Sequence, residues 1–216
     1  MLSILLIVAV LVGKFVVYGI SNIKTTEFKP VVSIFLLDIS ATNRQLLPKQ
    51  QQTVLRMAKK MDSEDQALIY VVTQDAFNIY NGKPNKIVAM RDAMQKRSTF
   101  DDKAYGTAYG LALKKAIGDA LIFKEKGYRP AIVILGDLEN EGAIEKQINW
   151  KLLPKNLESV KKYIPDLTLV FLYATPEKLD DVRQNLVSVV GEDHLIVAQE
   201  ENVEQAVKEF STAIGR

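Results

Sequence analysis

Hydrophobic residues in this chain follow two alternating spacings from residue 31 onward. Short, almost continuous apolar runs, each of strand length, occupy residues 31–37, 67–73, 131–135, 167–173 and 195–198. Apolar residues recur at helical spacing over residues 48–61, 106–123, 150–163, 177–190 and 203–214. Buried strands that alternate with amphipathic helices are typical of a doubly wound α/β fold, a mainly parallel sheet with helices on both faces.

One region departs from this alternation. Residues 77–80 and 86–89 flank Asn81-Gly82-Lys83-Pro84, a run of turn-forming residues. The pattern predicts a hairpin-like excursion from the sheet, followed by a short helix over residues 90–96.

The amino-terminal residues form a separate apolar segment. Residues 2–20 are apolar except for Ser3, Lys14, Tyr18 and the glycines. A helix of this length reaches about 30 Å, the hydrocarbon thickness of a bilayer, so we expect a transmembrane helix whose Lys14 side chain snorkels to the interface. The alternatives are a cleaved signal peptide, although no basic start or clear cleavage site is present, and a buried first strand or helix.

These patterns divide the chain into a membrane anchor (1–22), a polar linker (23–30) and a domain (31–216). The expected location is a membrane, with a single amino-terminal pass. Lys24 and Lys29 come after the anchor and nothing basic precedes it, which favours a cytoplasmic domain. An amino-terminal anchor can equally export the domain attached to it, so the two lysines leave the side of the membrane open.

Composition excludes several kinds of site. The formal net charge of the 216 residues is +2, with basic and acidic residues interleaved, so we expect no nucleic-acid partner. The absence of cysteine excludes disulfides, thiolate metal sites and a cysteine nucleophile. His194 is the only histidine, which excludes a multi-histidine zinc site and leaves one residue for any serine–histidine triad.

Polar oxygens come after the first predicted strand. Asp38, Ser40 and Thr42 occupy alternating positions directly after the apolar run, at the end of a strand where α/β sheets bind ligands. Carboxylate and hydroxyl oxygens are the donors that hard cations such as Mg²⁺ and Mn²⁺ prefer. Thr107 enters the middle helix and Asp137 comes after the 131–135 strand, so two further places offer oxygen ligands.

Together these three places resemble the metal-ion-dependent adhesion site of von Willebrand factor A (VWA) domains. The family's first loop reads Asp-x-Ser-x-Ser, and residues 38–42 read Asp-Ile-Ser-Ala-Thr. Residues 106–113, GTAYGLAL, look like the family's Gly-Thr-x-x-Gly-x-Ala-Leu. Residues 133–140, VILGDLEN, are similar to its Val-Ile-Leu-x-Thr-Asp-Gly-Glu-Asn but lack the threonine and the glycine that flank the aspartate.

The resemblance covers about residues 31–214 and implies a VWA-type domain with a metal site at Asp38, Ser40, Thr42, Thr107 and Asp137. The expected ion is Mg²⁺ or Mn²⁺, with Ca²⁺ as an alternative. These few protein ligands cannot fill an octahedral shell, so water or a partner's carboxylate must complete it. The implied function is divalent-cation-dependent binding of a protein that offers an acidic side chain, within a larger assembly and without catalysis.

Other interpretations remain at this point. Asp38, Ser40, Thr42 and Asp137 are also common in turns, and Thr107 can cap its helix. A metal-dependent phosphoryl-transfer or hydrolase enzyme is the second function, because acids at strand ends suit that chemistry. Against it, the aspartyl-phosphatase pattern needs an acid at Ser40, and no Gly-x-x-x-x-Gly-Lys-Ser/Thr loop occurs. A scaffold with a vestigial metal site is the third.

Overall fold

The computed structural model describes residues 29–97, 106–139 and 143–216. Within them the strands form one sheet with the order β3-β2-β1-β4-β5-β6. The strands are β1 (Val31–Asp38), β2 (Gln66–Val72), β3 (Ala76–Gly82), β4 (Arg129–Leu135), β5 (Thr168–Leu172) and β6 (Leu195–Ala198). The α-helices are α2 (Leu47–Ala58), α3 (Ile87–Arg97), α4 (Tyr109–Glu125), α5 (Leu153–Tyr163), α6 (Pro176–Val190) and α7 (Val203–Ala213).

The sheet is mainly parallel, as the alternation of strands and helices predicts. β1 pairs in parallel with both β2 and β4, and β4, β5 and β6 continue in parallel. Among the described strands only β3 runs antiparallel, against β2. The five predicted strands and the helices between them are confirmed, with boundaries that differ from the prediction by a few residues.

The prediction for residues 86–89 is wrong. Residues 87–89 form the start of α3 instead of a strand, and Lys86 precedes the helix. The hairpin consists of β2 and β3 and turns at Thr73, whose backbone N–H donates to the Asp75 carbonyl at 2.8 Å. Met90 and Met94 lie four residues apart on α3, and both are buried beneath it. This helical spacing against the sheet decides the conformation of the segment.

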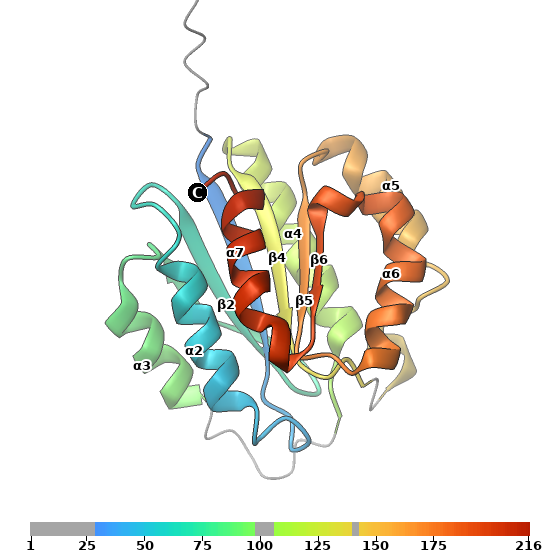
Figure 1. Ribbon diagram of the computed structural model, residues 1–216, viewed down its shortest axis with the longest axis horizontal. Helices are drawn as coiled ribbons and strands as arrows, with labels where there is room; N and C mark the ends of the chain where they lie inside the picture. The colour runs from blue at the N-terminus through green and yellow to red at the C-terminus, as the bar shows by residue number, and fades with distance from the viewer. Residues whose placement is uncertain (1–28, 98–105, 140–142) are drawn as a thin grey trace, which may run out of the picture.

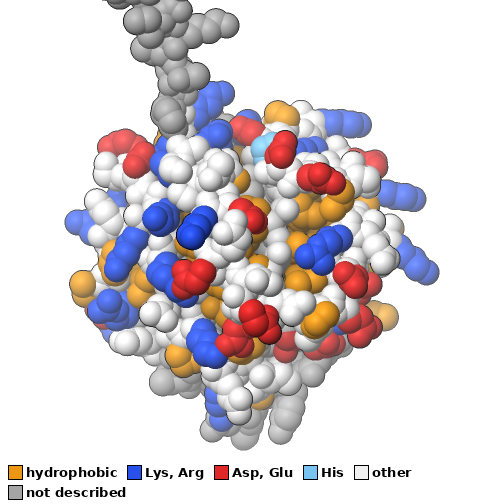
Figure 2. All heavy atoms as spheres, viewed as in Figure 1, with side chains coloured by type: hydrophobic (Ala, Val, Ile, Leu, Met, Phe, Trp, Pro, Cys, Tyr) orange, Lys and Arg blue, Asp and Glu red, His pale blue; other side chains and the backbone are white. Residues whose placement is uncertain are grey.

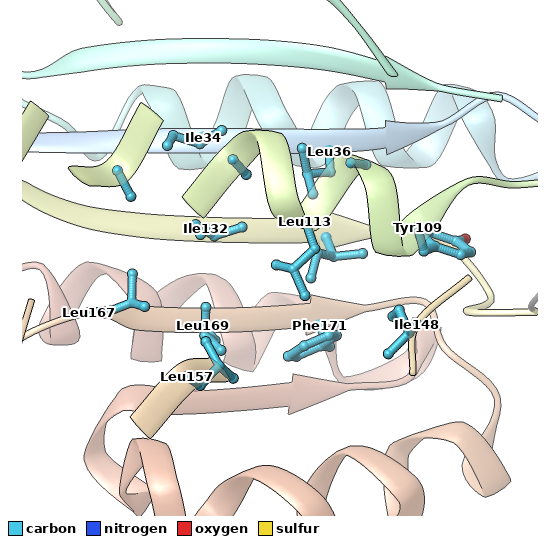
Figure 3. Packing of buried hydrophobic residues seen from close by; sticks show 14 of the residues in the cluster. Ile34, Leu36, Tyr109, Leu113, Ile132, Ile148, Leu157, Leu167, Leu169 and Phe171 are labelled. Carbon is cyan, nitrogen blue, oxygen red and sulfur yellow. The ribbon is translucent and has the colours of Figure 1, made fainter. Parts of the chain in front are cut away.

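Helices cover both faces of the sheet (Figure 1). Alternate residues of β1 supply the two faces: Ile34 and Leu36 join one buried cluster, whereas Phe35 and Leu37 join the other. The first cluster packs under α4, α5 and α6, and the second packs under α2, α3 and α7. Figure 3 shows part of the first cluster, from Ile34 and Leu36 to Leu157 on α5. Burial on both faces explains why β1 reads as an almost continuous apolar run.

The transmembrane prediction concerns residues 1–22, which lie outside the described part of the chain, as does most of the linker. Among the described residues, no helix combines the length and apolar character needed to cross a bilayer.

The strand order reverses beside β1. The chain leaves β1 toward β2 on one side, and β4 to β6 continue on the other side. In doubly wound sheets, the loops at such a reversal diverge to opposite faces and leave a crevice at the carboxyl ends of the strands. Here the carboxyl ends of β1 and β4 meet at this point, because Leu37 is paired with Leu135.

Candidate functional site

Asp38, the last residue of β1, is the centre of a hydrogen-bond network. Its carboxylate is buried, and Oδ1 accepts from the Ser40 backbone N–H at 2.8 Å and from the Thr107 hydroxyl at 3.5 Å. Oδ2 accepts from Asn43 Nδ2 at 2.7 Å and from the Tyr109 hydroxyl. Each oxygen therefore has two donors, and the carboxylate is held in a single orientation.

The loop after β1 brings two hydroxyls together. The Ser40 and Thr42 hydroxyl oxygens lie 3.0 Å apart; Ser40 is buried, whereas Thr42 is exposed. Asn43 fixes this loop because its Nδ2 also lies 3.4 Å from the Ser40 hydroxyl, and Gln50 on α2 donates to Asn43 Oδ1 at 3.3 Å. Sequence reasoning missed Asn43 and Gln50, because their burial, which indicates a polar network, appears only in the structure.

Thr107 reaches Asp38 from the other side of the crevice. Its loop is tied to the end of β2, because the Ala108 backbone N–H donates to the Thr73 carbonyl at 2.6 Å. Ala108 precedes α4 without a side-chain cap, so the alternative interpretation of Thr107 as a helix cap is wrong. The buried Thr107 hydroxyl bonds to Asp38 instead.

Asp137 lies two residues after the end of β4 and is half-buried. Its Oδ1 accepts from the Glu139 backbone N–H at 2.9 Å, which is the turn contact expected of an aspartate at a strand end. The same oxygen lies 3.4 Å from the Tyr109 hydroxyl. Asp137 is thus a turn residue that also joins the network around Asp38.

Tyr109 links the two acids, and sequence reasoning did not single it out. This buried side chain begins α4; its hydroxyl donates to Asp38 and lies beside Asp137. Figure 3 shows its ring at one end of the apolar cluster, next to the end of β4. The sequence did hold a signal that could have identified Tyr109 as a site residue: it comes two residues after the candidate ligand Thr107, near the start of a predicted helix.

The two departures from the VWA pattern have a structural explanation. Position 136 has a glycine where the family has threonine, and a Cβ there would lie 2.1 Å from the Tyr109 hydroxyl. Position 138 has a leucine where the family has glycine, and Leu138 adopts a left-handed backbone with φ of 60°, a conformation that glycine adopts more readily. The phenol thus occupies the space that a side chain at position 136 would fill.

Burial controls the ionisation of the site. Desolvation raises the pKa of the Asp38 carboxyl to about 6, against the lowering effect of the hydrogen bonds from Tyr109 and Ser40, while the Asp137 charge raises it further. Burial, with the nearby Asp38 and Asp137 carboxylates, raises the pKa of Tyr109 well above 10. The phenol is therefore a neutral hydrogen-bond donor at physiological pH.

The five predicted site residues gather at one edge of the sheet, within one network that includes Tyr109 and Asn43. Only two of them are acidic, and the described residues contain no group of three histidine, cysteine or acidic side chains placed to hold a metal. Any cation at this edge would therefore depend on the hydroxyls of Ser40, Thr42 and Thr107. Hard oxygen donors suit Mg²⁺ or Mn²⁺ better than softer metals.

Comparison of the sequence finds no matching protein-family model and no matching curated protein. Comparison of the fold finds VWA domains. Proximal thread matrix protein 1 from the mussel byssus is 10% identical, with 86% of this chain and 48% of that chain covered and a TM-score of 0.59. An aerotolerance-related membrane protein from Bacteroides fragilis is 18% identical, covering 85% and 98%, with a TM-score of 0.58. The SpRpn10 VWA domain is 12% identical, covering 83% and 95%, with a TM-score of 0.60.

This chain has the VWA fold, as the three-part resemblance implied. It spans about half the length of the mussel matrix protein, which has also been solved with zinc in its metal-ion-dependent adhesion site. At these identities the likeness concerns the fold.

Proposed function

We propose that this domain binds another protein through the carboxyl edge of its sheet, and that a divalent cation held near Asp38 makes part of the contact. The observation that carries the proposal is the convergence of two carboxylates and three hydroxyls from three separate segments at the point where the strand order reverses. Domains of this fold in an adhesin and a matrix protein agree with a role in protein interaction.

The donor set fits a hard cation. Neighbouring ligands in an octahedral Mg²⁺ shell, with bonds of about 2.1 Å, lie roughly 3 Å apart. The Ser40 and Thr42 hydroxyl oxygens are separated by 3.0 Å. These two hydroxyls, together with Thr107, would hold the ion, and Asp38 and Asp137 would supply the negative charge that balances it. When bound, the ion would act as a Lewis acid for a ligand oxygen.

The partner would complete the shell. Thr42 is exposed and Asp137 is half-buried, so the outer side of the donor set is open to another molecule. An ion neutralised by only two carboxylates favours a further anionic oxygen, which the side chain of aspartate or glutamate supplies. We therefore propose a protein partner with an exposed acidic residue. Basic and acidic side chains are interspersed on the face covered by α2 and α7 (Figure 2), so the described surface there offers no broad basic patch for nucleic acid.

The proposed setting is a membrane. Residues 1–22 are the proposed single-pass anchor, and one protein with this fold is named as an aerotolerance-related membrane protein. An anchored binding domain would hold its partner at the bilayer as part of a larger assembly. Mg²⁺ and Mn²⁺ are the proposed ions, with Ca²⁺ as an alternative.

The enzyme hypothesis has less support. The single histidine, His194, lies at the amino ends of β5 and β6, where its Nδ1 is 3.4 Å from the Thr168 hydroxyl. That is the edge of the sheet opposite Asp38, so His194 is not placed to form a triad with Ser40. We propose a non-catalytic role.

The test is calorimetric titration of Mg²⁺ and Mn²⁺ into the full chain in detergent. We expect saturable binding by the wild type and loss of binding in Asp38→Ala. Asp180→Ala is the matched control, because Asp180 is an exposed aspartate on α6. Capture of partners with Mg²⁺ or with a chelator then tests metal dependence. Equal capture under both conditions would replace this proposal with the scaffold hypothesis, and Mg²⁺-dependent phosphatase turnover that needs Asp38 would replace it with the enzyme hypothesis.

A further inference from the structure

We propose that Tyr109 is a positioning residue of the cation site, and that Gly136 is the residue that makes room for it. The proposal rests on the proposed function and adds a residue pair to it. Neither residue would contact the ion. Tyr109 would set the direction of the Asp38 carboxylate and its distance from Asp137.

The contacts of the phenol carry the first step. Its hydroxyl has one proton to donate, and the close contact goes to Asp38 Oδ2. It accepts from the Leu138 backbone N–H at 3.3 Å and lies 3.4 Å from Asp137 Oδ1. The hydroxyl therefore ties the end of β1 to the loop after β4, the two segments that supply the acids.

The orientation of Asp38 results from these contacts. Tyr109 and Asn43 bind Oδ2, so Oδ1 is turned toward Ser40 and Thr107. Oδ1 is thus the oxygen on the side of the hydroxyl ligands. Without the phenol, Oδ2 would keep Asn43 alone, and the carboxylate would lose one of the four hydrogen bonds that hold its orientation.

Gly136 is the steric partner of the phenol. A Cβ at this position would lie 2.1 Å from the Tyr109 hydroxyl oxygen and 2.7 Å from Asp38 Cβ. No side chain other than hydrogen fits while the phenol donates to Asp38. Residues 109 and 136 are therefore coupled, since the shortest contact of a larger residue at 136 would be with the hydroxyl; the contact with Asp38 would remain and require Asp38 to shift.

The first experiment titrates Mg²⁺ and Mn²⁺ into Tyr109→Phe in the full chain. Loss of a hydrogen bond that orients a metal ligand typically weakens metal binding by about 10- to 100-fold, and we expect a loss in this range. Tyr70→Phe is the matched control, because the Tyr70 phenol also donates to a carboxylate, that of Asp119, away from the site. Wild-type affinity in Tyr109→Phe would overturn the proposal.

The second experiment tests the pair without a metal. Gly136→Ala is made in the wild type and in the Tyr109→Phe background, and urea unfolding midpoints are compared. We expect Gly136→Ala to lower the midpoint strongly in the wild type and by less when the phenol hydroxyl is removed, because the closest contact is then gone and only the contact with Asp38 remains. Gly118→Ala is the control, because nothing lies within 4 Å of a Cβ at that position.

The two experiments separate the proposals. If the wild type binds no cation, the metal in the proposed function and the positioning role of Tyr109 are both wrong, and the unfolding cycle decides only the pairing of Tyr109 with Gly136. Equal effects of Gly136→Ala in both backgrounds would then overturn the pairing, and a reduced effect without the hydroxyl would support it. If Gly136→Ala does not fold in the wild type but folds with Tyr109→Phe, the coupling is demonstrated directly.

Discussion

At the scale of single residues, the buried carboxylate of Asp38 couples stability to pH. Its pKa of about 6 in the folded protein exceeds its ordinary value of 3.8, because burial disfavours the charge. The folded state therefore holds the proton more tightly than the unfolded state between about pH 4 and pH 6. Over that range, the contribution of Asp38 to the free energy of unfolding falls as the pH rises.

We expect this fall to disappear in Asp38→Asn. The difference in unfolding free energy between the two proteins should change by about 1–3 kcal/mol from pH 4 to pH 7, in favour of the variant at the higher pH. The asparagine side chain of the variant faces the four hydrogen-bond donors that surround Asp38. This mismatch changes the difference in unfolding free energy by an amount that does not vary with pH. Urea unfolding at four pH values measures the difference, and a value that stays constant across them would contradict the expectation.

Leu138 shows two opposing effects at one residue. Its φ of 60° strains the backbone, which costs about 1–2 kcal/mol relative to glycine. Its side chain is buried in the cluster under α4, and removal of a buried leucine costs about 3–5 kcal/mol. The second effect is larger, so we expect Leu138→Gly to lower the free energy of unfolding by about 1–4 kcal/mol in chemical denaturation. An increase would show that the strain dominates.

At the scale of elements, α4 connects the site to the rest of the fold. Its first turn carries Tyr109, and the next residue, Gly110, touches the segment after β4: a Cβ there would lie 2.1 Å from the Gln147 carbonyl oxygen. Gly118, about two turns later on the same helix, faces open space. Packing therefore requires glycine at position 110 but not at position 118.

Alanine at these two positions should have opposite effects. Gly118→Ala should raise the free energy of unfolding by about 0.5–1 kcal/mol, because alanine favours the helix. Gly110→Ala should lower it by about 1–3 kcal/mol, since the backbone of Gln147 must move. Thermal unfolding of both variants measures the effects, and similar values for the two would mean that α4 does not approach residue 147 closely.

At the scale of the whole molecule, the edge opposite the site holds a second buried acid. Asp65, before β2, accepts from the Val31 backbone N–H at 2.7 Å, from the Asp62 N–H at 2.8 Å and from the Arg216 guanidinium at 2.7 Å. These bonds join the start of β1, the turn before β2 and the residues after α7. The contact therefore stabilises the fold at a distance from Asp38, which ends the same strand.

We expect Asp65→Ala to separate stability from binding. It should lower the free energy of unfolding by about 2–4 kcal/mol, because it leaves the buried Val31 N–H without its acceptor and removes one of the two carboxylates that pair with the Arg216 guanidinium. Cation affinity below the unfolding temperature should be unchanged, because the site lies at the other end of β1. Unfolding and calorimetric titration of the same protein measure both, and a loss of affinity in the folded variant would contradict this expectation.

Much of the architecture was predictable from local pattern. The buried strands, the helices between them and the parallel sheet result from periodicity, because burial on one or two faces determines which residues must be apolar. The second strand of the predicted hairpin was not predictable in this way. Residues 86–89 suit a strand by composition, but residues 87–89 are helical because Met90 and Met94 are buried against the sheet. Residues 1–28 lie outside the described chain, so the anchor stays a prediction.

The sequence by itself determined the order of the elements and the run of oxygens at Asp38, Ser40 and Thr42, because these depend on residues close together in the chain. Tertiary structure decided what surrounds Asp38. Tyr109 lies 71 positions away in the sequence, and its hydroxyl reaches Asp38 only because Gly136, directly after another strand, has no side chain. Periodicity shows which face of an element is buried but not which atoms are in contact across the crevice. Those contacts determine the geometry of the site.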